Sequence, residues 1–380
     1  MQGRASPYTE NPQMEGDHIK INRWFTPLSW LYGIGTAVRN TLYNIGVLSS
    51  YAYDIPIIDV GNITVGGTGK TPHIEYLVRL LSPYYKVAIL SRGYKRKSSG
   101  YVLAKPDTPM HEIGDEPWQM KQKFPDIHVA VDSDRCRGIK RLCSDTETSN
   151  VQVILLDDAF QYRRVRAGLN ILLIDYHRMI TDDRLLPAGR LREKAEGKDR
   201  ADIVIITKCP TNIKPMGYRV IRSALHLKPF QFLFYSSIHY GELTHMDHGE
   251  KISLDELRGQ NPHILLLSGI GNPLQLEQDM RRYAQHVTPM AFADHHYFST
   301  EDLTLIQQTY DSLPAPKIII TTEKDASRLR HLPEIPPSLR EHMYVLPIQV
   351  EFMRNESKTF NQKIKDYVRQ NPRNSKLAQG

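Results

Sequence analysis

The stretch that most constrains the fold runs from Val60 to Thr71 and reads Val-Gly-Asn-Ile-Thr-Val-Gly-Gly-Thr-Gly-Lys-Thr. An apolar run, Ile55 to Val60, leads into it, and apolar residues at helical spacing follow from Ile74 to Leu81. Strand, glycine loop, Gly-Lys-Thr and helix are the layout of a phosphate-binding loop. In such a loop, backbone N–H groups and the helix N-terminus surround phosphate oxygens. The stretch therefore predicts a nucleotide site; the alternative is a glycine-rich turn that binds nothing.

Within this loop, Lys70 is expected to reach the β- and γ-phosphates, and the Thr71 hydroxyl is expected to bind Mg²⁺. The usual motif has glycine four residues before its Gly-Lys pair, where this chain has Thr64. The predicted nucleotide-binding residues are Thr64, Val65, Gly66, Gly67, Thr68, Gly69, Lys70 and Thr71.

Composition narrows the class of protein and of partner. The chain has 380 residues, enough for two domains, and its 40% apolar and 24% charged content is typical of globular proteins. Lysine and arginine number 49 against 42 acidic residues, and the net charge of +7 favours an anionic partner. Three cysteines without zinc spacing indicate reduced thiols. The polar leader suggests no secretory signal, and Met14 is an alternative start to Met1.

The region from Trp24 to Leu48 is the most apolar part of the N-terminal sequence. Its apolar residues fall near one helical face, but Arg39, Asn40 and Asn44 interrupt them, so the region has no bilayer-spanning run. Two interpretations remain equally open on composition. The helix packs in the core, or it lies in a membrane interface with its aromatic rings at headgroup level.

Several polar residues follow predicted strands, as expected at the functional edge of a parallel sheet covered on both faces. One strand ends at Ser91-Arg92. A second ends at Asp157-Asp158, where a phosphate-loop fold places another Mg²⁺ contact, and Gln161 follows at helical spacing. Asp175 also ends a strand, and a turn role is equally consistent with it.

Two further polar segments are less distinctive. Asp115 and Glu116 precede a proline, which is also an ordinary helix start. Arg192 and Glu193 lie in a loop, and although arginine suits phosphate, the residues alone favour a solvated charged loop.

The pattern changes between residues 210 and 235, where prolines flank an aromatic strand at residues 231–235. We therefore predict a loose leader at 1–23, a phosphate-loop α/β domain at 24–225, a smaller α/β domain at 226–352, and a docking helix with a loose tail at 353–380. The smaller domain contains Asp294-His295-His296, and successive side chains point to different sides, so at most one histidine enters a given site.

Taken together, the motifs resemble the tetraacyldisaccharide 4'-kinase family, the lipid A 4'-kinases of Gram-negative bacteria. The resemblance runs from about residue 24 to 352, and the family's phosphate loop also has threonine at the position of Thr64. The residues that carry it are Gly61 to Pro72, Ser91 to Tyr94, Gly114 to Pro117, Asp157 to Gln161, Gly189 to Glu193, Gly269 to Pro273, Asp294-His295 and Thr322 to Ala326.

The resemblance implies ATP-dependent, Mg²⁺-assisted phosphorylation of the 4'-hydroxyl of a tetraacylated glucosamine disaccharide 1-phosphate. It also implies a peripheral position on the cytoplasmic face of the inner membrane, with the region from Trp24 to Leu48 as the membrane-facing helix. By resemblance Asp115 is the catalytic base and His295, brought in by domain closure, orients it or raises its basicity. Ser91, Arg92, Glu116, Gln161, Arg192 and Glu193 are further site residues.

Rival functions fit the sequence less well. A partitioning ATPase has lysine where this chain has Val65. A GTPase has an Asn/Thr-Lys-x-Asp motif that recognises guanine, and this motif is absent from the sequence. No basic and aromatic stripe indicates nucleic-acid binding, and no obligate protein partner is predicted. A kinase of a soluble small molecule is the closest enzymatic alternative, but it leaves the aromatic N-terminal helix without a role.

Overall fold

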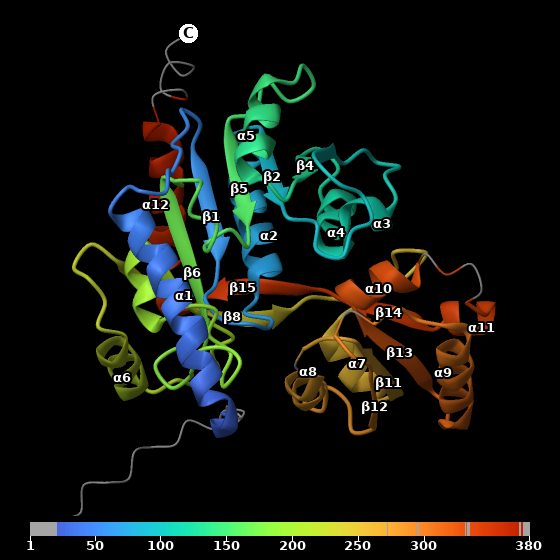
Figure 1. The fold of residues 1–380 in the computed structure, drawn as a ribbon. Coiled ribbons are helices and arrows are strands. Elements are labelled where there is room, and N and C mark those ends of the chain that lie inside the picture. Colours follow the sequence, from blue (N-terminus) through green and yellow to red (C-terminus); the bar gives the residue numbers. More distant parts are fainter. Residues whose placement is uncertain are drawn as a thin grey trace, which may run out of the picture.

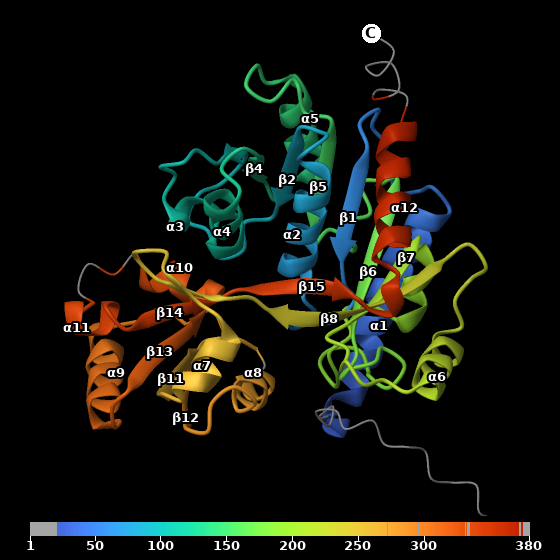
Figure 2. The same cartoon turned by 180° about the vertical axis from the view of Figure 1, so that it is seen from behind.

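The computed structural model describes residues 21–371 and residue 374, apart from residues 272, 295, 331, 333 and 334. Most of the predicted leader, both candidate starts, the end of the predicted tail and His295 lie outside the described residues. The described chain forms two α/β units. Figure 1 and Figure 2 show two long strands, β8 (Phe232–Tyr240) and β15 (Ile348–Phe352), running from one unit toward the other.

The larger unit is built on a nine-stranded sheet of order β15-β8-β7-β6-β1-β5-β2-β4-β3. All neighbours from β8 to β4 pair in parallel, whereas β15 and β3 are antiparallel edge strands. The inner strands are apolar runs because a parallel sheet is covered on both faces. They are β1 (Ile57–Gly61), β2 (Val87–Ser91), β4 (His128–Val131), β5 (Val153–Asp157), β6 (Leu169–Asp175) and β7 (Ile203–Thr207), and the edge strand β3 spans Val102–Leu103.

Helices cover both faces of this sheet. On one face, α2 (Lys70–Leu81), α4 (Asp115–Lys123) and α12 (Ser357–Gln370) share a core. On the other, α5 (Arg135–Ser144) and α6 (Pro215–Leu225) pack over different strands. The short elements are α3 (Met110–Ile113) and the 3₁₀ turns η1 (Arg23–Phe25), η2 (Ala195–Arg200) and η3 (Met353–Asn355). The last helix, which the sequence predicts as a docking helix, buries Phe360, Ile364 and Val368 in this core.

The smaller unit contains a six-stranded sheet of order β10-β9-β14-β13-β11-β12 with an apolar core on each face. Its strands are β9 (Leu243–His245), β10 (Lys251–Ile252), β11 (His263–Ser268), β12 (Val287–Ala291), β13 (Lys317–Thr322) and β14 (Met343–Leu346). Its helices are α7 (Leu254–Gln260), α8 (Pro273–Met280), α9 (Thr300–Ser312), α10 (Glu323–Leu329) and α11 (Pro337–Arg340).

The position of β8 corrects the predicted domain organisation. The sequence pattern places the aromatic strand in the smaller domain, but β8 pairs in parallel with β7 of the larger sheet. The chain leaves the larger sheet only after Tyr240 and returns to it through β15, which pairs with β8. The division between the units therefore lies near residues 240 and 347 and not at residue 226.

The N-terminal helix α1 (Thr26–Asn44) has an unusual distribution of side chains. Its inner face is small and polar: Ser29 donates a hydrogen bond to the carbonyl of Leu185 at 2.9 Å, and a Cβ on Gly33 would come within 2.8 Å of the Leu185 side chain. Its outer face is apolar and solvent-exposed, and it carries Trp30, Leu31, Ile34 and Val38. The interpretation of this region as a core-packed helix is therefore wrong. Within the described residues, no helix combines the length and apolar character that a bilayer span requires.

Candidate active site

The phosphate loop lies at the carboxyl end of β1, where parallel α/β sheets bind their ligands. Gly66 and Gly69 have φ angles of +113° and +84°, which glycine adopts without strain and which bend the backbone around an anion. The turn is fixed by one of its own side chains and by one from β7. The Asn62 amide donates to the Thr68 hydroxyl at 2.8 Å, and the Thr207 hydroxyl at the end of β7 donates to the Thr68 carbonyl at 2.9 Å.

The segment from residue 186 to 193 covers one side of this loop. The Val65 N–H donates to the Arg190 carbonyl at 2.8 Å, and the Arg192 N–H donates to the Ile63 carbonyl at 2.8 Å. Thr64 forms an isolated bridge with Leu191, which is buried. The expectation of a solvated charged loop, which the residues alone favour, is therefore wrong, because backbone hydrogen bonds fasten this segment to the phosphate loop.

The acid pair lies at the end of β5, beside β1. Asp158 is in the left-handed region with a φ of +51°, so the predicted helical continuation toward Gln161 is wrong. Its carboxylate lies 3.7 Å from Lys70 Nζ and 3.0 Å from an Arg192 guanidinium nitrogen. Burial by itself raises the pKa of Asp158, but Lys70 and Arg192 outweigh this effect and lower the pKa below its ordinary value.

Asp157 differs from its neighbour because it lacks a cationic partner at contact distance among the described residues. The Ser91 hydroxyl donates to Asp157 Oδ2 at 2.9 Å, while the buried Oδ1 has no hydrogen-bond partner among them. Burial raises the pKa of Asp157 to about 7, with further contributions from the charges of Glu116 and Asp158. A buried carboxylate with an unsatisfied oxygen is a suitable position for a cation.

The donor set fits Mg²⁺ bound mainly through ATP. Mg²⁺ is typically held by one or two protein oxygens together with substrate phosphates and waters, and carboxylates and hydroxyls are suitable ligands. The described residues contain no group of three or more His, Cys, Asp or Glu that could hold a metal unaided. The oxygens that could contribute are those of Asp157 and of Thr71, in the first turn of α2.

Gln161 and Glu193 connect the loop to its surroundings. Gln161 donates to the Asn62 carbonyl at 2.6 Å and to the Glu193 carboxylate at 3.2 Å. The Glu193 side chain is buried, pairs with Arg200 at 2.8 Å, and accepts a hydrogen bond from Asn40 of α1. These contacts indicate that Glu193 supports the site and links it to the N-terminal helix.

Asp115 begins α4, at the junction of the two units, and is buried. Its carboxylate pairs with Arg328 of α10 at 2.6 Å. The next residue, Glu116, lies close enough to raise the pKa of Asp157, which relates the start of α4 to the phosphate site. Arg92 is exposed, and its charge acts on the buried Arg135 beside the acid pair.

Of the two adjacent histidines, the structure describes His296, and His295 lies outside the described residues. His296 is held by Asp302 at 2.7 Å, within the capping box that begins α9. Asp294 pairs with Lys324 of α10 at 2.8 Å. The expectation that at most one histidine serves a given site therefore leaves His295 as the candidate.

Sequence reasoning missed several charged residues of the site. Asp59 interrupts the apolar run of β1, and burial together with the charge of Asp158 raises its pKa to about 8. Lys208 bonds the Gly67 carbonyl and pairs with Asp175 at 2.7 Å. Arg328 follows the Thr322 to Ala326 motif. Asp59 could have been identified from the sequence, because it is an acid inside an apolar strand. Lys208 and Arg328 could not, because their partners are distant in sequence.

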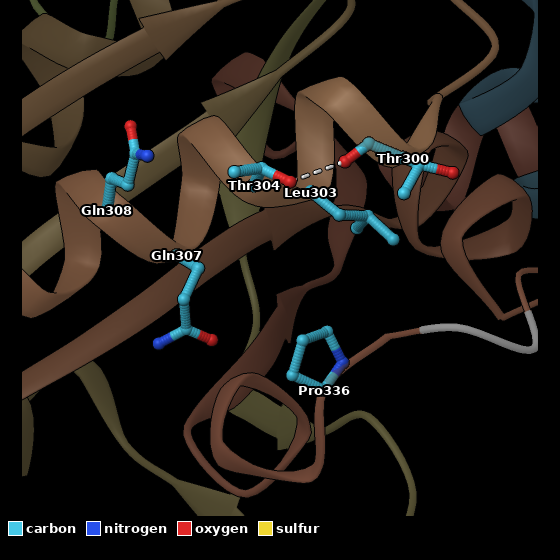
Figure 3. A pocket seen from close by; sticks show the side chains of 6 residues that line it. All are labelled: Thr300, Leu303, Thr304, Gln307, Gln308 and Pro336. Carbon is cyan, nitrogen blue, oxygen red and sulfur yellow. Dashed lines mark hydrogen bonds between the residues drawn. The ribbon is translucent and has the colours of Figure 1, made fainter.

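A cavity of about 230 Å³ lies elsewhere, beside α9 of the smaller unit (Figure 3). Among the described residues, its lining contains no ionisable side chain and therefore offers no acid or base. The lining residues are Thr300, Leu303, Thr304, Gln307, Gln308 and Pro336.

Comparison with known proteins identifies the family. A family model described as Tetraacyldisaccharide-1-P 4'-kinase matches residues 21–369. The tetraacyldisaccharide 4'-kinase of Phocaeicola vulgatus is 53% identical over 367 residues, covering 96% of this chain and 100% of that protein. That of Bacteroides thetaiotaomicron is 47% identical over 374 residues, covering 96% and 98%.

A solved structure agrees with these relatives. The "apo" form of LpxK from Aquifex aeolicus in complex with ATP is 29% identical, with a TM-score of 0.70, and the match covers 91% of this chain and 98% of that one. The kinase function and the α/β fold expected from the sequence are thereby confirmed. The chain belongs to the tetraacyldisaccharide-1-P 4'-kinase family.

Proposed function

We propose that the chain applies its family's kinase activity to the 4'-hydroxyl of a tetraacylated glucosamine disaccharide 1-phosphate, with ATP as the phosphate donor. The family match supports the substrate, and the solved relative, whose title includes ATP, supports the donor. The observation that carries the proposal is the convergence of three features: the phosphate loop, the acid pair at the end of β5, and the buried Asp115 at the start of α4.

ATP phosphates are bound by the N–H groups of residues 64–71 and by Lys70. Phosphoryl transfer requires little covalent help from the protein, so positioning and charge neutralisation provide most of the catalysis. Asp157 and Thr71 would hold a Mg²⁺ ion together with the ATP phosphates, and such an ion would supply neutralisation of the charge that develops on the transferred group. Asp158 contributes differently, since its contacts with Lys70 and Arg192 hold both cations beside the loop.

Asp115 is the general base. A carboxylate within hydrogen-bond reach of the acceptor hydroxyl takes its proton as the new O–P bond forms, and ADP leaves with the electrons of the broken O–P bond. Burial at the junction of the units keeps Asp115 out of bulk water. His295, by resemblance, orients this base when the smaller unit closes over the acceptor.

The acceptor carries acyl chains, so the enzyme must work at a lipid surface. The exposed apolar face of α1 supports a peripheral membrane position, with the acyl chains remaining in the bilayer while the sugar reaches the site. Contacts from Asn40 to Glu193 and from Tyr32 to the Arg192 carbonyl join this helix to the loop segment beside the phosphate site. The cytoplasmic face of the inner membrane follows from the use of ATP, and the charge of +7 suits an anionic leaflet.

The assignment of the base can be tested by phosphate transfer to the purified lipid in detergent, comparing wild type, Asp115→Asn and Glu112→Gln. Removing a general base costs about 10²- to 10⁴-fold in rate. Asp115→Asn is expected to lose that much while still binding ATP. Glu112→Gln is the matched control, because it removes an acid from the neighbouring α3 without touching the site. Full activity in Asp115→Asn would contradict the assignment.

The same assay separates the alternatives. A partitioning or switch ATPase would hydrolyse ATP and leave the lipid unmodified. A kinase of a soluble small molecule would also leave the lipid unmodified. Its activity on its own acceptor would not depend on the apolar face of α1.

A further inference from the structure

The contact between α4 and α10 joins the proposed base to the smaller unit. Arg328 Nη2 and Nε donate to the same carboxylate oxygen of Asp115, Oδ2, at 2.6 and 3.2 Å. The two side chains are only 1% and 6% exposed. Two hydrogen bonds from one planar guanidinium converge on this oxygen and hold it in the plane of the guanidinium.

Arg328 is itself held rigidly. Its Nη1 donates to Asp325 Oδ1 at 3.2 Å, three residues earlier on α10. Asp325 is in turn fixed through Oδ2, which accepts hydrogen bonds from the Thr322 hydroxyl at 2.7 Å and from the Gly269 N–H at 2.8 Å. The guanidinium therefore has one orientation, set by the smaller unit, and its single positive charge lies between two buried carboxylates.

A second ion-pair group fastens the other end of α4. Lys123 Nζ lies 2.5 Å from Glu323 of α10 and 2.7 Å from the buried Glu75 of α2. Lys123 ends α4 and Asp115 begins it, so at 1.5 Å per residue they are about 12 Å apart along the helix. This group joins the same two units without touching the proposed base, so it offers a matched control.

We propose that Arg328 is a positioning residue for the 4'-kinase reaction. It aligns the Asp115 carboxylate toward the acceptor hydroxyl and balances its buried charge, so that the base is set only when α10 is docked on α4. The inference rests on the proposed role of Asp115 as the base. Without the guanidinium, the buried carboxylates of Asp115 and Asp325 lose the cation they share, and burial of their charge then favours movement or protonation.

The first test compares steady-state transfer by Arg328→Gln, Arg328→Lys and Lys123→Gln. A misplacement of about 1 Å can cost about 10²-fold in rate, so Arg328→Gln is expected to lower kcat about 100-fold and to leave the KM for ATP within about threefold. Arg328→Lys keeps the positive charge but lacks the planar guanidinium. Its kcat is expected to be at least about tenfold higher than that of Arg328→Gln. Lys123→Gln is expected to keep kcat within about threefold.

Thermal unfolding of the same variants separates positioning from stability, because both glutamine variants remove an ion pair between the units. Equal losses of kcat in Arg328→Gln and Lys123→Gln, in proportion to their melting temperatures, would overturn the inference. So would a kcat for Arg328→Gln within about threefold of wild type. If Arg328→Gln does not fold, Arg328→Lys takes its place, with an expected kcat at least about fivefold below wild type.

A double-mutant cycle with Asp115→Asn tests whether Arg328 acts through Asp115. In the Asp115→Asn background, Arg328→Gln is expected to lower the residual rate by less than about threefold, because the carboxylate it serves is gone. A further loss of about 100-fold would show that Arg328 acts elsewhere and would overturn the inference. The two proposals fail separately: an inactive Asp115→Asn with a fully active Arg328→Gln removes only this inference, whereas a fully active Asp115→Asn removes the base assignment and this inference with it.

Discussion

The exposed face of α1 leads to the most quantitative prediction. Trp24 of the preceding turn η1 and Trp30 and Ile34 of α1 are 93%, 70% and 61% exposed, although all three are large and apolar. A surface helix of a globular protein ordinarily packs its apolar side inward, whereas this one packs Ser29 and Gly33 inward. The arrangement is the one expected of a helix whose apolar face enters a lipid interface.

The magnitude follows from these exposures. Fully burying a large apolar side chain is worth about 1.5–3 kcal/mol. An interface buries only part of each side chain, so we take about 1 kcal/mol for each. Replacing Trp24, Trp30 and Ile34 by glutamine should then weaken membrane binding by about 3 kcal/mol, or about 100-fold in the partition coefficient. Glutamine is a good helix former and the side chains are already exposed, so folding stability should change little.

The assay is cosedimentation with vesicles that contain anionic lipid, followed by thermal unfolding of the same samples. A control variant replaces Leu274 and Leu305 by glutamine; these residues are exposed on the smaller unit, at 59% and 50%. The control should bind vesicles like wild type. An unchanged partition coefficient in the α1 variant, or an equal loss in the control, would refute the interpretation of α1 as a membrane-binding helix.

Three further predictions concern the metal, the pH dependence of stability and the core. Asp157→Asn should lower phosphate transfer by at least about 10²-fold and raise the Mg²⁺ concentration needed for half activity. It should raise this concentration more than Asp158→Asn does, and a Mg²⁺ titration that ranks the two variants in the opposite order would contradict the assignment. His73 is buried against Gly69 and Ser236, and burial lowers its pKa to about 4, below the ordinary 6.5, so its contribution to stability is present above pH 6.5 and is lost as pH falls toward 4. Between pH 7 and 5 this loss is about 2 kcal/mol. Over the same pH range, the decrease in the free energy of unfolding should therefore be smaller in His73→Gln than in wild type by that amount. An equal decrease in both proteins would rule out His73 as the cause. Phe360→Ala should destabilise the fold by about 3–5 kcal/mol, measured by denaturant unfolding, because Phe360 is fully buried; a loss below about 1 kcal/mol would mean that α12 is not part of the core.

Local sequence features were sufficient to predict the centre of the larger unit. Apolar runs ending in Asp157 or Ser91, and a glycine loop before Lys70, predict parallel strands and a phosphate site. Each of these features lies within one short stretch of sequence, and the structure brings them together at the carboxyl ends of neighbouring strands. The nucleotide role of the loop and the metal role of Asp157 remain predictions.

The remaining features depended on partners that are distant in sequence. The pairing of β8 with β7 is a choice among strand partners, and the run of Phe232 to Tyr235 gives no indication of it. Arg328 and Asp115 are 213 positions apart, so no spacing rule relates them. For α1, the pattern of apolar residues defined a face, but a sequence pattern cannot state whether that face meets the core or the outside.

The most direct test of the central claim is the fate of the γ-phosphate. The purified chain would be incubated with γ-labelled ATP, Mg²⁺ and tetraacyl disaccharide 1-phosphate in detergent, and the lipid analysed by mass spectrometry and phosphorus NMR. The account predicts one added phosphate on the 4' position, in an amount equal to the ADP formed, and loss of this product in Asp115→Asn. Label released as inorganic phosphate with unmodified lipid, or label on another hydroxyl, would contradict it.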